Sequence, residues 1–176
     1  MFDAGYQSDS GKFDDVTLKL ETILSENHKV LVFSSFVKHL AIFESWCQER
    51  EIEYALLTGA TGKREEVINR FRKNTDVRLF LISLKAGGVG LNLTEADYVF
   101  ILDPWWNPAA EMQAISRAHR IGQDKSVFVY RFISSGSIEE KIMKLQERKS
   151  NLAEAFVRSD SNMAGMSNEE VMDLFE

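Results

Sequence analysis

The chain has 176 residues, of which 44% are hydrophobic, and this is enough for one domain with a substantial core. Its formal net charge of −6 argues against indiscriminate nucleic-acid binding through total charge. The single cysteine, Cys47, excludes an internal disulfide bond and favours a reducing, intracellular environment, with the thiol buried in a structural role.

Two further classes of function receive no support from the sequence. No apolar run is long enough to cross a bilayer, and no signal-peptide pattern is present, so we expect no membrane partner. The three histidines, His28, His39 and His119, are not spaced as metal ligands, so we expect no metal site.

Five short apolar runs alternate along the chain with longer amphipathic segments. The runs are rich in Val, Ile, Leu, Phe and Tyr, and several are apolar on both faces, as buried parallel strands must be. They span residues 30–34, 53–57, 78–84, 98–103 and 127–133. Helical patterns occupy residues 14–26, 36–50, 63–73, 108–120 and 138–157. This alternation predicts an α/β fold in which helices flank a parallel sheet.

The distinctive segments of the chain follow directly after predicted strands. In an open parallel sheet, ligands bind beyond the carboxyl ends of the strands. The segments at this edge are Ser34-Ser35, residues 58–61, residues 85–90 and residues 103–108. We expect this coincidence in a ligand-binding domain and not in a purely structural one.

Two of these segments have the residue types of phosphate sites. In residues 85–90, glycines allow backbone amides to approach an anion, while Lys85 and Ser83 add donors; a tight turn explains the glycines equally well. Thr58-Gly59-Ala60-Thr61, with Arg64 one helical turn later, offers hydroxyls, amides and a cation at a helix start. A turn followed by a helix cap is the alternative there.

The most specific pattern lies in residues 113–123, where Gln113, Arg117 and Arg120 follow helical spacings of four and three. Two arginines on one helix face form a fixed pair of forks for phosphate oxygens. Phosphoryl-transfer enzymes direct such groups at the terminal phosphate of a nucleotide. In the preceding segment, Trp105 is expected in the core, whereas Trp106 is a candidate for a ring placed against nucleic acid.

In their order and residue types, these segments resemble the second RecA-like lobe of Swi/Snf-type ATPases, the DNA-translocating branch of the superfamily-two helicases. The resemblance runs from about residue 12 to residue 152 and rests on five motifs. They are Val30-Leu-Val-Phe-Ser-Ser35, Thr58-Gly-Ala-Thr61, residues 82–93 (ISLKAGGVGLNL), Asp103-Pro-Trp-Trp-Asn-Pro108 and residues 113–123 (QAISRAHRIGQ).

The resemblance implies a RecA-like lobe over residues 28–136, of the fold of P-loop NTPases but without the P-loop. An N-terminal segment with a flanking helix (1–27) precedes it. A helix that braces this lobe against its partner (137–157) and a linker with a short acidic helix (158–176) follow it.

The resemblance also implies roles for individual residues. Arg117 and Arg120 would be catalytic arginine fingers at an ATP site, which Gly90, Asn92 and Gln113 would share. The Mg²⁺ ligands would lie on a first lobe. Phosphates of double-stranded DNA would be held by residues of the strand ends, and Trp106 would touch the groove. The implied phosphate-binding residues are Ser34, Gly59, Thr61, Arg64, Ser83, Lys85, Gly87 and Gly88.

The chain lacks both a Gly-x4-Gly-Lys-Ser/Thr loop and an acidic Mg²⁺-binding motif, and arginine fingers alone cannot hold Mg-ATP. We therefore expect the carboxyl-terminal portion of a longer DNA-dependent ATPase, inactive by itself, whose partners are duplex DNA, the first lobe and a DNA-bound cargo protein. A non-hydrolysing DNA- or protein-binding adaptor and a strand-separating helicase are the alternatives. Variant motif residues at Ser35, Thr58 and Leu84 favour a bacterial source, with location in the cytoplasm or nucleoid.

Overall fold

The computed structural model describes residues 11–86, 91–103, 105, 108–118, 126–134, 137 and 139–146. At positions 108, 110, 114, 117 and 118 it describes the backbone alone. The final part of the predicted helix 138–157 and the segment 158–176 lie outside the described residues, and so do residues 1–10.

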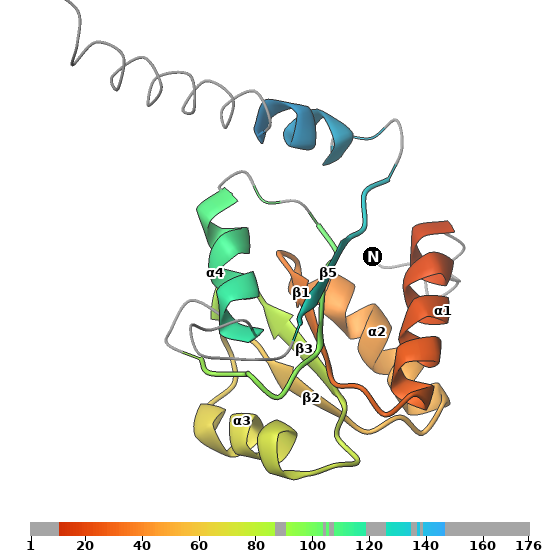
Figure 1. The fold of residues 1–176 in the computed structure, drawn as a ribbon, viewed down its shortest axis with the longest axis vertical. Helices are drawn as coiled ribbons and strands as arrows, with labels where there is room; N and C mark the ends of the chain where they lie inside the picture. Colours follow the sequence, from red (N-terminus) through yellow and green to blue (C-terminus); the bar gives the residue numbers. More distant parts are fainter. Residues whose placement is uncertain are drawn as a thin grey trace, which may run out of the picture.

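Five parallel strands form one sheet in the order β2-β3-β1-β4-β5 (Figure 1). The parallel sheet predicted from the alternating runs is therefore confirmed. The strands are β1 (Val30–Ser34), β2 (Tyr54–Leu57), β3 (Leu79–Ser83), β4 (Tyr98–Ile101) and β5 (Phe128–Arg131). Each lies within its predicted run. β1 and β3 are buried throughout because they pair on both sides, whereas β5 is an edge strand and is partly exposed.

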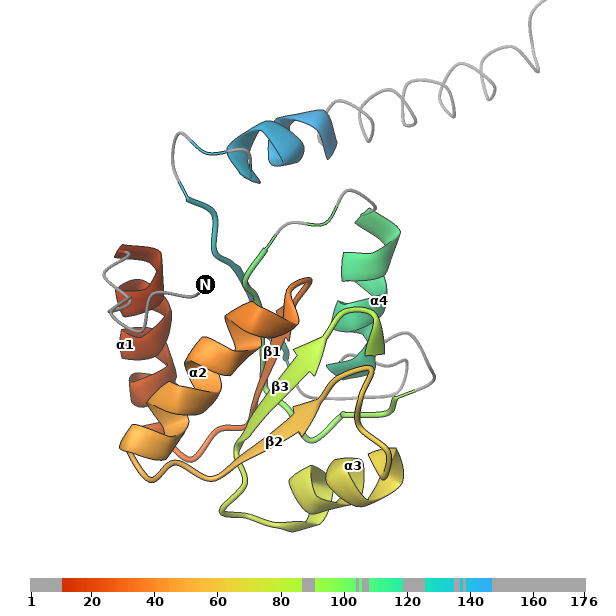
Figure 2. The same cartoon turned by 180° about the vertical axis from the view of Figure 1, so that it is seen from behind.

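Helices cover both faces of the sheet, as predicted. Apolar side chains of α1 and α2 pack with Val32 and Phe100 on one face. On the opposite face, Phe71 of α3 and Ile115 of α4 pack with Phe33 and Ile101. Figure 2 shows the same three layers from behind. The helices are α1 (Gly11–Ser25), α2 (Val37–Glu49), α3 (Arg64–Lys73) and α4 (Pro108–Ala118).

Strand direction places the two ends of α4 at opposite edges of the sheet. β4 ends at Ile101, α4 follows, and β5 then runs parallel to β4. A helix that joins two parallel strands must return from the carboxyl edge to the amino edge. α4 therefore begins at the carboxyl edge, and its last turn, which contains position 117, lies toward the amino edge (Figure 1).

A short helix over residues 139–146 follows β5 and lies beyond the sheet, at the end toward which the strands point (Figure 2). Glu139 in its first turn accepts hydrogen bonds from Lys12 Nζ of α1 at 2.8 and 2.7 Å and from the Ser134 amide at 2.9 Å. Ile142 is buried. These contacts fix the start of this helix against α1.

Candidate functional site

A buried carboxylate organises the carboxyl edge of the sheet between β1 and β4. Asp103 Oδ2 accepts hydrogen bonds from Ser34 Oγ at 2.6 Å and from the Ser35 amide at 2.8 Å. His39 Nδ1 of α2 lies 2.9 Å from the other oxygen, Oδ1. Burial raises the pKa of Asp103, but the hydrogen bonds from His39, Ser34 and the Ser35 amide outweigh it, so the pKa lies below its usual value.

This hydrogen-bond network fixes the position of Ser34, one of the predicted DNA-binding residues. Its side chain is fully buried, and its hydroxyl donates to Asp103. The sequence motif contains Asp103 but assigns it no role. Its place after a buried strand was the signal that could have indicated it, since a carboxylate there must be paired.

The loop after β3 brings three other predicted residues together. Ser83 is buried, and its hydroxyl accepts a hydrogen bond from the Ala86 amide at 3.3 Å. Arg64, at the start of α3, donates from Nη2 to the Ala86 carbonyl. Lys85 lies between these anchored positions and is exposed. The loop therefore exposes Lys85 to solvent, while Arg64 holds the neighbouring residue Ala86.

The turn after β2 satisfies its own hydrogen bonds. The Thr58 amide donates to Thr61 Oγ1 at 3.0 Å, and the Ala60 amide donates to Thr58 Oγ1 at 3.3 Å. Gly59 is exposed, and a Cβ built on it would meet no atom within 4 Å. The hydroxyls are thus explained by the turn alone, whereas no described neighbour requires a glycine at position 59.

Several predicted site residues are not described. Gly87, Gly88, Gly90, Trp106 and Arg120 lie outside the described residues, and Arg117 is described by its backbone alone, in the last turn of α4.

Two of the predicted ATP-site residues are described on the α3–α4 side of the sheet. Gln113 is exposed on α4. Asn92 lies between Leu91 and Leu93, which pack in the same core cluster as Ile115 of α4. The buried Oδ1 of Asn92 has no hydrogen-bond partner among the described residues. An unpaired buried acceptor is costly, so this position suits a donor that the described residues do not supply.

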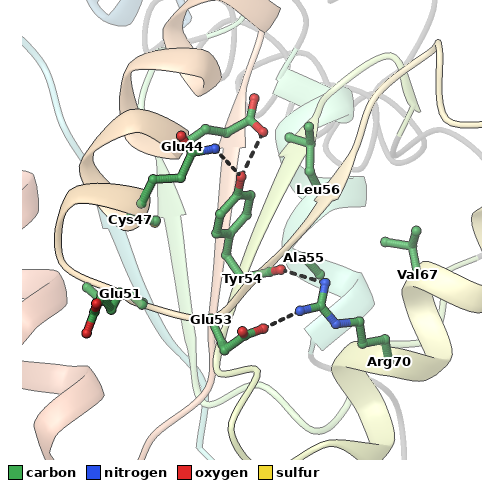
Figure 3. A pocket seen from close by; sticks show the side chains of 11 residues that line it. Glu44, Cys47, Glu51, Glu53, Tyr54, Ala55, Leu56, Val67 and Arg70 are labelled. Carbon is green, nitrogen blue, oxygen red and sulfur yellow. Dashed lines mark hydrogen bonds and ion pairs between the residues drawn. The ribbon is translucent and has the colours of Figure 1, made fainter.

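A cavity of about 740 Å³ lies beside the edge strand β2, between α2, β2 and α3 (Figure 3). Four of its polar side chains, Glu44, Gln48, Glu53 and Arg70, are hydrogen-bonded to Tyr54 or to one another. The Tyr54 hydroxyl donates to Glu44 Oε1 at 3.2 Å, and Arg70 donates to the Tyr54 carbonyl at 3.2 Å and to Glu53. These groups therefore hold α2, β2 and α3 together around the cavity. In the described part of the chain, no three metal-ligating side chains form a group, and no helix is long and apolar enough to span a membrane.

Cys47 lines this cavity, but its surroundings make the thiol unreactive. Burial, and secondarily Glu44, raise the pKa of the thiol from 9.0 to about 12. At pH 8 the thiolate fraction is therefore about a thousandfold smaller than for an unperturbed thiol. We expect the native chain to react with a thiol reagent such as dithionitrobenzoate at least a hundredfold more slowly than the guanidinium-unfolded chain. Equal rates would show that the thiol is accessible.

Comparison with known proteins identifies the family. The family model described as "Helicase conserved C-terminal domain" matches residues 15–122. The DNA repair protein rad8 of Schizosaccharomyces pombe is 42% identical over 161 residues, which are 90% of this chain and 14% of that protein. The ISWI chromatin-remodeling complex ATPase ISW2 of Saccharomyces cerevisiae is 36% identical over 174 residues, which are 95% of this chain and 16% of that protein.

A solved structure shows the same fold. The C-terminal part of the Fun30 ATPase domain superposes with a TM-score of 0.75 at 38% sequence identity. The superposition covers 82% of this chain and 48% of the solved one. The chain thus spans about one seventh of the length of rad8 and about half of that crystallised domain.

The comparisons correct one expectation. The motif variants at Ser35, Thr58 and Leu84 favoured a bacterial source. The two relatives named above, however, come from yeasts. A chromatin-remodeling ATPase of Arabidopsis thaliana is also 37% identical over 160 residues. The bacterial inference is therefore wrong. Thr58 illustrates the reason: its hydroxyl and amide serve a local turn, which carries no information about the source.

The sheet order, the motif order and these similarities agree. The chain belongs to the helicase conserved C-terminal domain family, in its Swi/Snf-type branch, as the second RecA-like lobe.

Proposed function

We propose that this lobe belongs to an ATP-dependent motor that moves along double-stranded DNA. The observation that carries the proposal is the course of α4. This helix begins beside the loops of the carboxyl edge and ends at the turn that carries Arg117. One rigid element thus joins a candidate DNA-binding edge to a candidate nucleotide site. The relatives named above include a DNA repair protein and a chromatin-remodeling ATPase.

In this proposal, DNA phosphates lie along the carboxyl edge. Lys85 supplies an exposed positive charge, Arg64 contacts the next residue of the same loop, and the exposed Gly59 allows a phosphate to approach the backbone amides. Thr61 holds that turn through its hydroxyl. Ser34 and Ser83, whose hydroxyls are already engaged, hold the strand ends beneath the track. Gly87, Gly88 and Trp106 are assigned to the same track. Phosphate contacts carry little sequence information, which suits a motor that steps along any duplex.

The ATP site is assigned to the amino-edge end of α4, where a first lobe of the same polypeptide would close over the nucleotide. Arg117 and Arg120 would stabilise the charge that develops on the transferred phosphoryl group. Gln113, Gly90 and Asn92 would contact the nucleotide, and the unpaired Asn92 Oδ1 fits a hydrogen-bond donor there. Mg²⁺ would be held by acidic residues of the first lobe, so we expect the 176-residue chain alone to be inactive.

The test is triplex displacement by the full-length protein that contains this lobe. ATP-dependent release of a third strand from duplex DNA, without separation of the duplex strands, supports the translocase. Separation of the duplex in a strand-displacement assay would make it a helicase. DNA binding without either activity and without ATP hydrolysis would make it an adaptor.

Gly59 offers a direct test of the proposed DNA track. Because a Cβ at this position meets nothing within 4 Å, Gly59→Ala should leave the free energy of unfolding within about 0.5 kcal/mol of the unmodified protein. The added methyl group should nevertheless weaken duplex binding severalfold, because it obstructs the approach of a phosphate. The measurement is fluorescence anisotropy with labelled duplex DNA at fixed salt.

The matched control is Gly11→Ala. Gly11 also has open space around a built Cβ, but it lies at the start of α1. This variant should bind DNA with unchanged affinity. Equal affinities for all three proteins would remove Gly59 from the DNA track.

A further inference from the structure

Glu111, in the first turn of α4, is buried although it carries a charge. Its side chain is 2% exposed. One oxygen, Oε1, accepts a hydrogen bond from the Trp105 amide at 2.8 Å, and the other, Oε2, accepts one from Arg131 Nε at 3.0 Å. A buried carboxylate is strongly unfavourable unless such donors satisfy it. The position is therefore stable only while the loop after β4 and strand β5 both remain in place.

The helix 139–146 reaches the same point. Gln146 Nε2 donates to the Trp105 carbonyl and lies 3.5 Å from Glu111 Oε1. At its other end, this helix is held by the ion pair between Glu139 and Lys12. It therefore spans the carboxyl edge from α1 to the beginning of α4. Three segments converge on Glu111 of α4: the preceding loop at Trp105, strand β5 and the helix 139–146.

We propose that Glu111 is a positioning residue that couples the helix 139–146 to the orientation of α4. The inference rests on the proposed function, because α4 carries Gln113 and Arg117 toward the nucleotide. Arg117 lies six positions after Glu111, which is about 9 Å along a helix. A tilt of about 10° at the first turn would displace position 117 by about 1.5 Å. Displacements of about 1 Å at reacting groups cost about a hundredfold in rate.

The direction of the effect follows from this geometry. When the helix 139–146 is docked, Gln146 and Glu111 hold the Trp105 loop from both sides and fix the start of α4. When the helix 139–146 leaves, the Trp105 carbonyl and one oxygen of Glu111 lose a donor. Glu111 then keeps its hydrogen bonds from Arg131 and the Trp105 amide but loses its connection to the helix 139–146. Movement of this helix thereby changes phosphoryl transfer without touching the nucleotide.

The test uses the full-length protein with Glu111→Gln. This variant preserves the shape of the side chain and one acceptor oxygen, so it serves even if Glu111→Ala fails to fold. We expect kcat for DNA-stimulated ATP hydrolysis to fall about 10- to 100-fold, with the KM for ATP changed less than threefold. The matched control is Glu21→Gln, since Glu21 Oε1 also accepts from an arginine Nε, at 2.8 Å, but on the exposed surface between α1 and α2. This control should retain its kcat.

Two further measurements separate coupling from simple loss of stability. The double variant Glu111→Gln with Gln146→Ala should be no slower than the slower single variant, because Gln146 is proposed to act on α4 only through Glu111 and the Trp105 loop. Hydrogen exchange should accelerate in residues 139–146 of the Glu111 variant, and in the first turn of α4 of the Gln146 variant. Independent, multiplying effects on kcat would overturn the proposal, and so would an unchanged kcat.

The exchange measurement also keeps this inference distinct from the proposed function. If the unmodified full-length protein shows no DNA-stimulated hydrolysis, the motor assignment fails. Reciprocal acceleration of exchange would still establish the connection between Glu111 and the helix 139–146. Unchanged exchange in both variants would overturn it.

Discussion

Replacement of Arg120 by alanine in the full-length protein should lower DNA-stimulated ATP hydrolysis about a thousandfold. The guanidinium group is proposed to stabilise negative charge that develops only in the transition state. Its loss should therefore reduce kcat far more than it raises the KM for ATP. Steady-state hydrolysis assays at saturating duplex DNA measure both constants. Binding of duplex DNA should be nearly unchanged, because α4 ends, two residues before Arg120, at the opposite edge of the sheet from the proposed DNA track.

Two controls make this prediction specific. Arg120→Lys keeps the charge but loses the planar fork, so it should restore little activity. Arg50→Ala removes an exposed arginine whose Nε pairs with Glu21, and it should hydrolyse ATP at the unmodified rate. Turnover of Arg120→Ala within threefold of the unmodified protein would remove the catalytic role assigned to this residue.

Asp103→Ala should produce the largest loss of stability among the polar substitutions considered. The Asp103 carboxylate is 7% exposed and serves three donors. Alanine leaves the Ser35 amide without this acceptor and the buried Ser34 hydroxyl with only the Phe36 carbonyl, at 3.2 Å. We expect a loss of about 3 kcal/mol in the free energy of unfolding, measured by urea denaturation. Asp76→Ala, at an exposed position before β3, should change stability by less than about 0.5 kcal/mol.

The same carboxylate predicts a pH dependence with a definite sign. Its folded-state pKa is lower than the ordinary value of 3.8, so the folded state binds fewer protons than the unfolded state. The stabilisation is fully present above about pH 5 and is lost as the pH falls below 4 toward the folded-state pKa. The stability difference between the unmodified protein and Asp103→Asn should therefore shrink over that interval. A difference that stays constant from pH 7 to pH 3 would contradict the assigned role of the charge.

Local patterns were sufficient to predict the layers of this fold. Residues 30–34 and 79–83 are continuous apolar runs because both strands pair on two sides, and the structure buries every one of their positions. The helical pattern predicted from residue 108 begins where α4 begins, at a proline whose missing amide costs nothing in the first helical position. Family motifs also carried the recognition of the lobe, which the match over residues 15–122 confirms.

The parts that escaped prediction depend on residues far apart in the chain. Asp103 contacts Ser34 across 69 positions, and Gln146 meets Glu111 across 35. No periodicity or spacing rule connects such positions. The place of Asp103 after a buried strand indicates that its carboxylate is paired, but the sequence does not give the partner of either carboxylate. Ser34 shows the consequence: its place at a strand end indicated a phosphate contact, which stays a prediction, whereas its hydrogen bond to Asp103 could not be foreseen. The assignments of the arginine pair and of the DNA track remain predictions.

The most direct measurement is ATP hydrolysis by the full-length protein in the presence and absence of duplex DNA, beside the isolated 176-residue chain. The account predicts hydrolysis that duplex DNA stimulates at least tenfold in the full-length protein, and none by the isolated lobe. Hydrolysis that is absent from the full-length protein, or indifferent to duplex DNA, would contradict the claim that this lobe completes a DNA-driven ATP site.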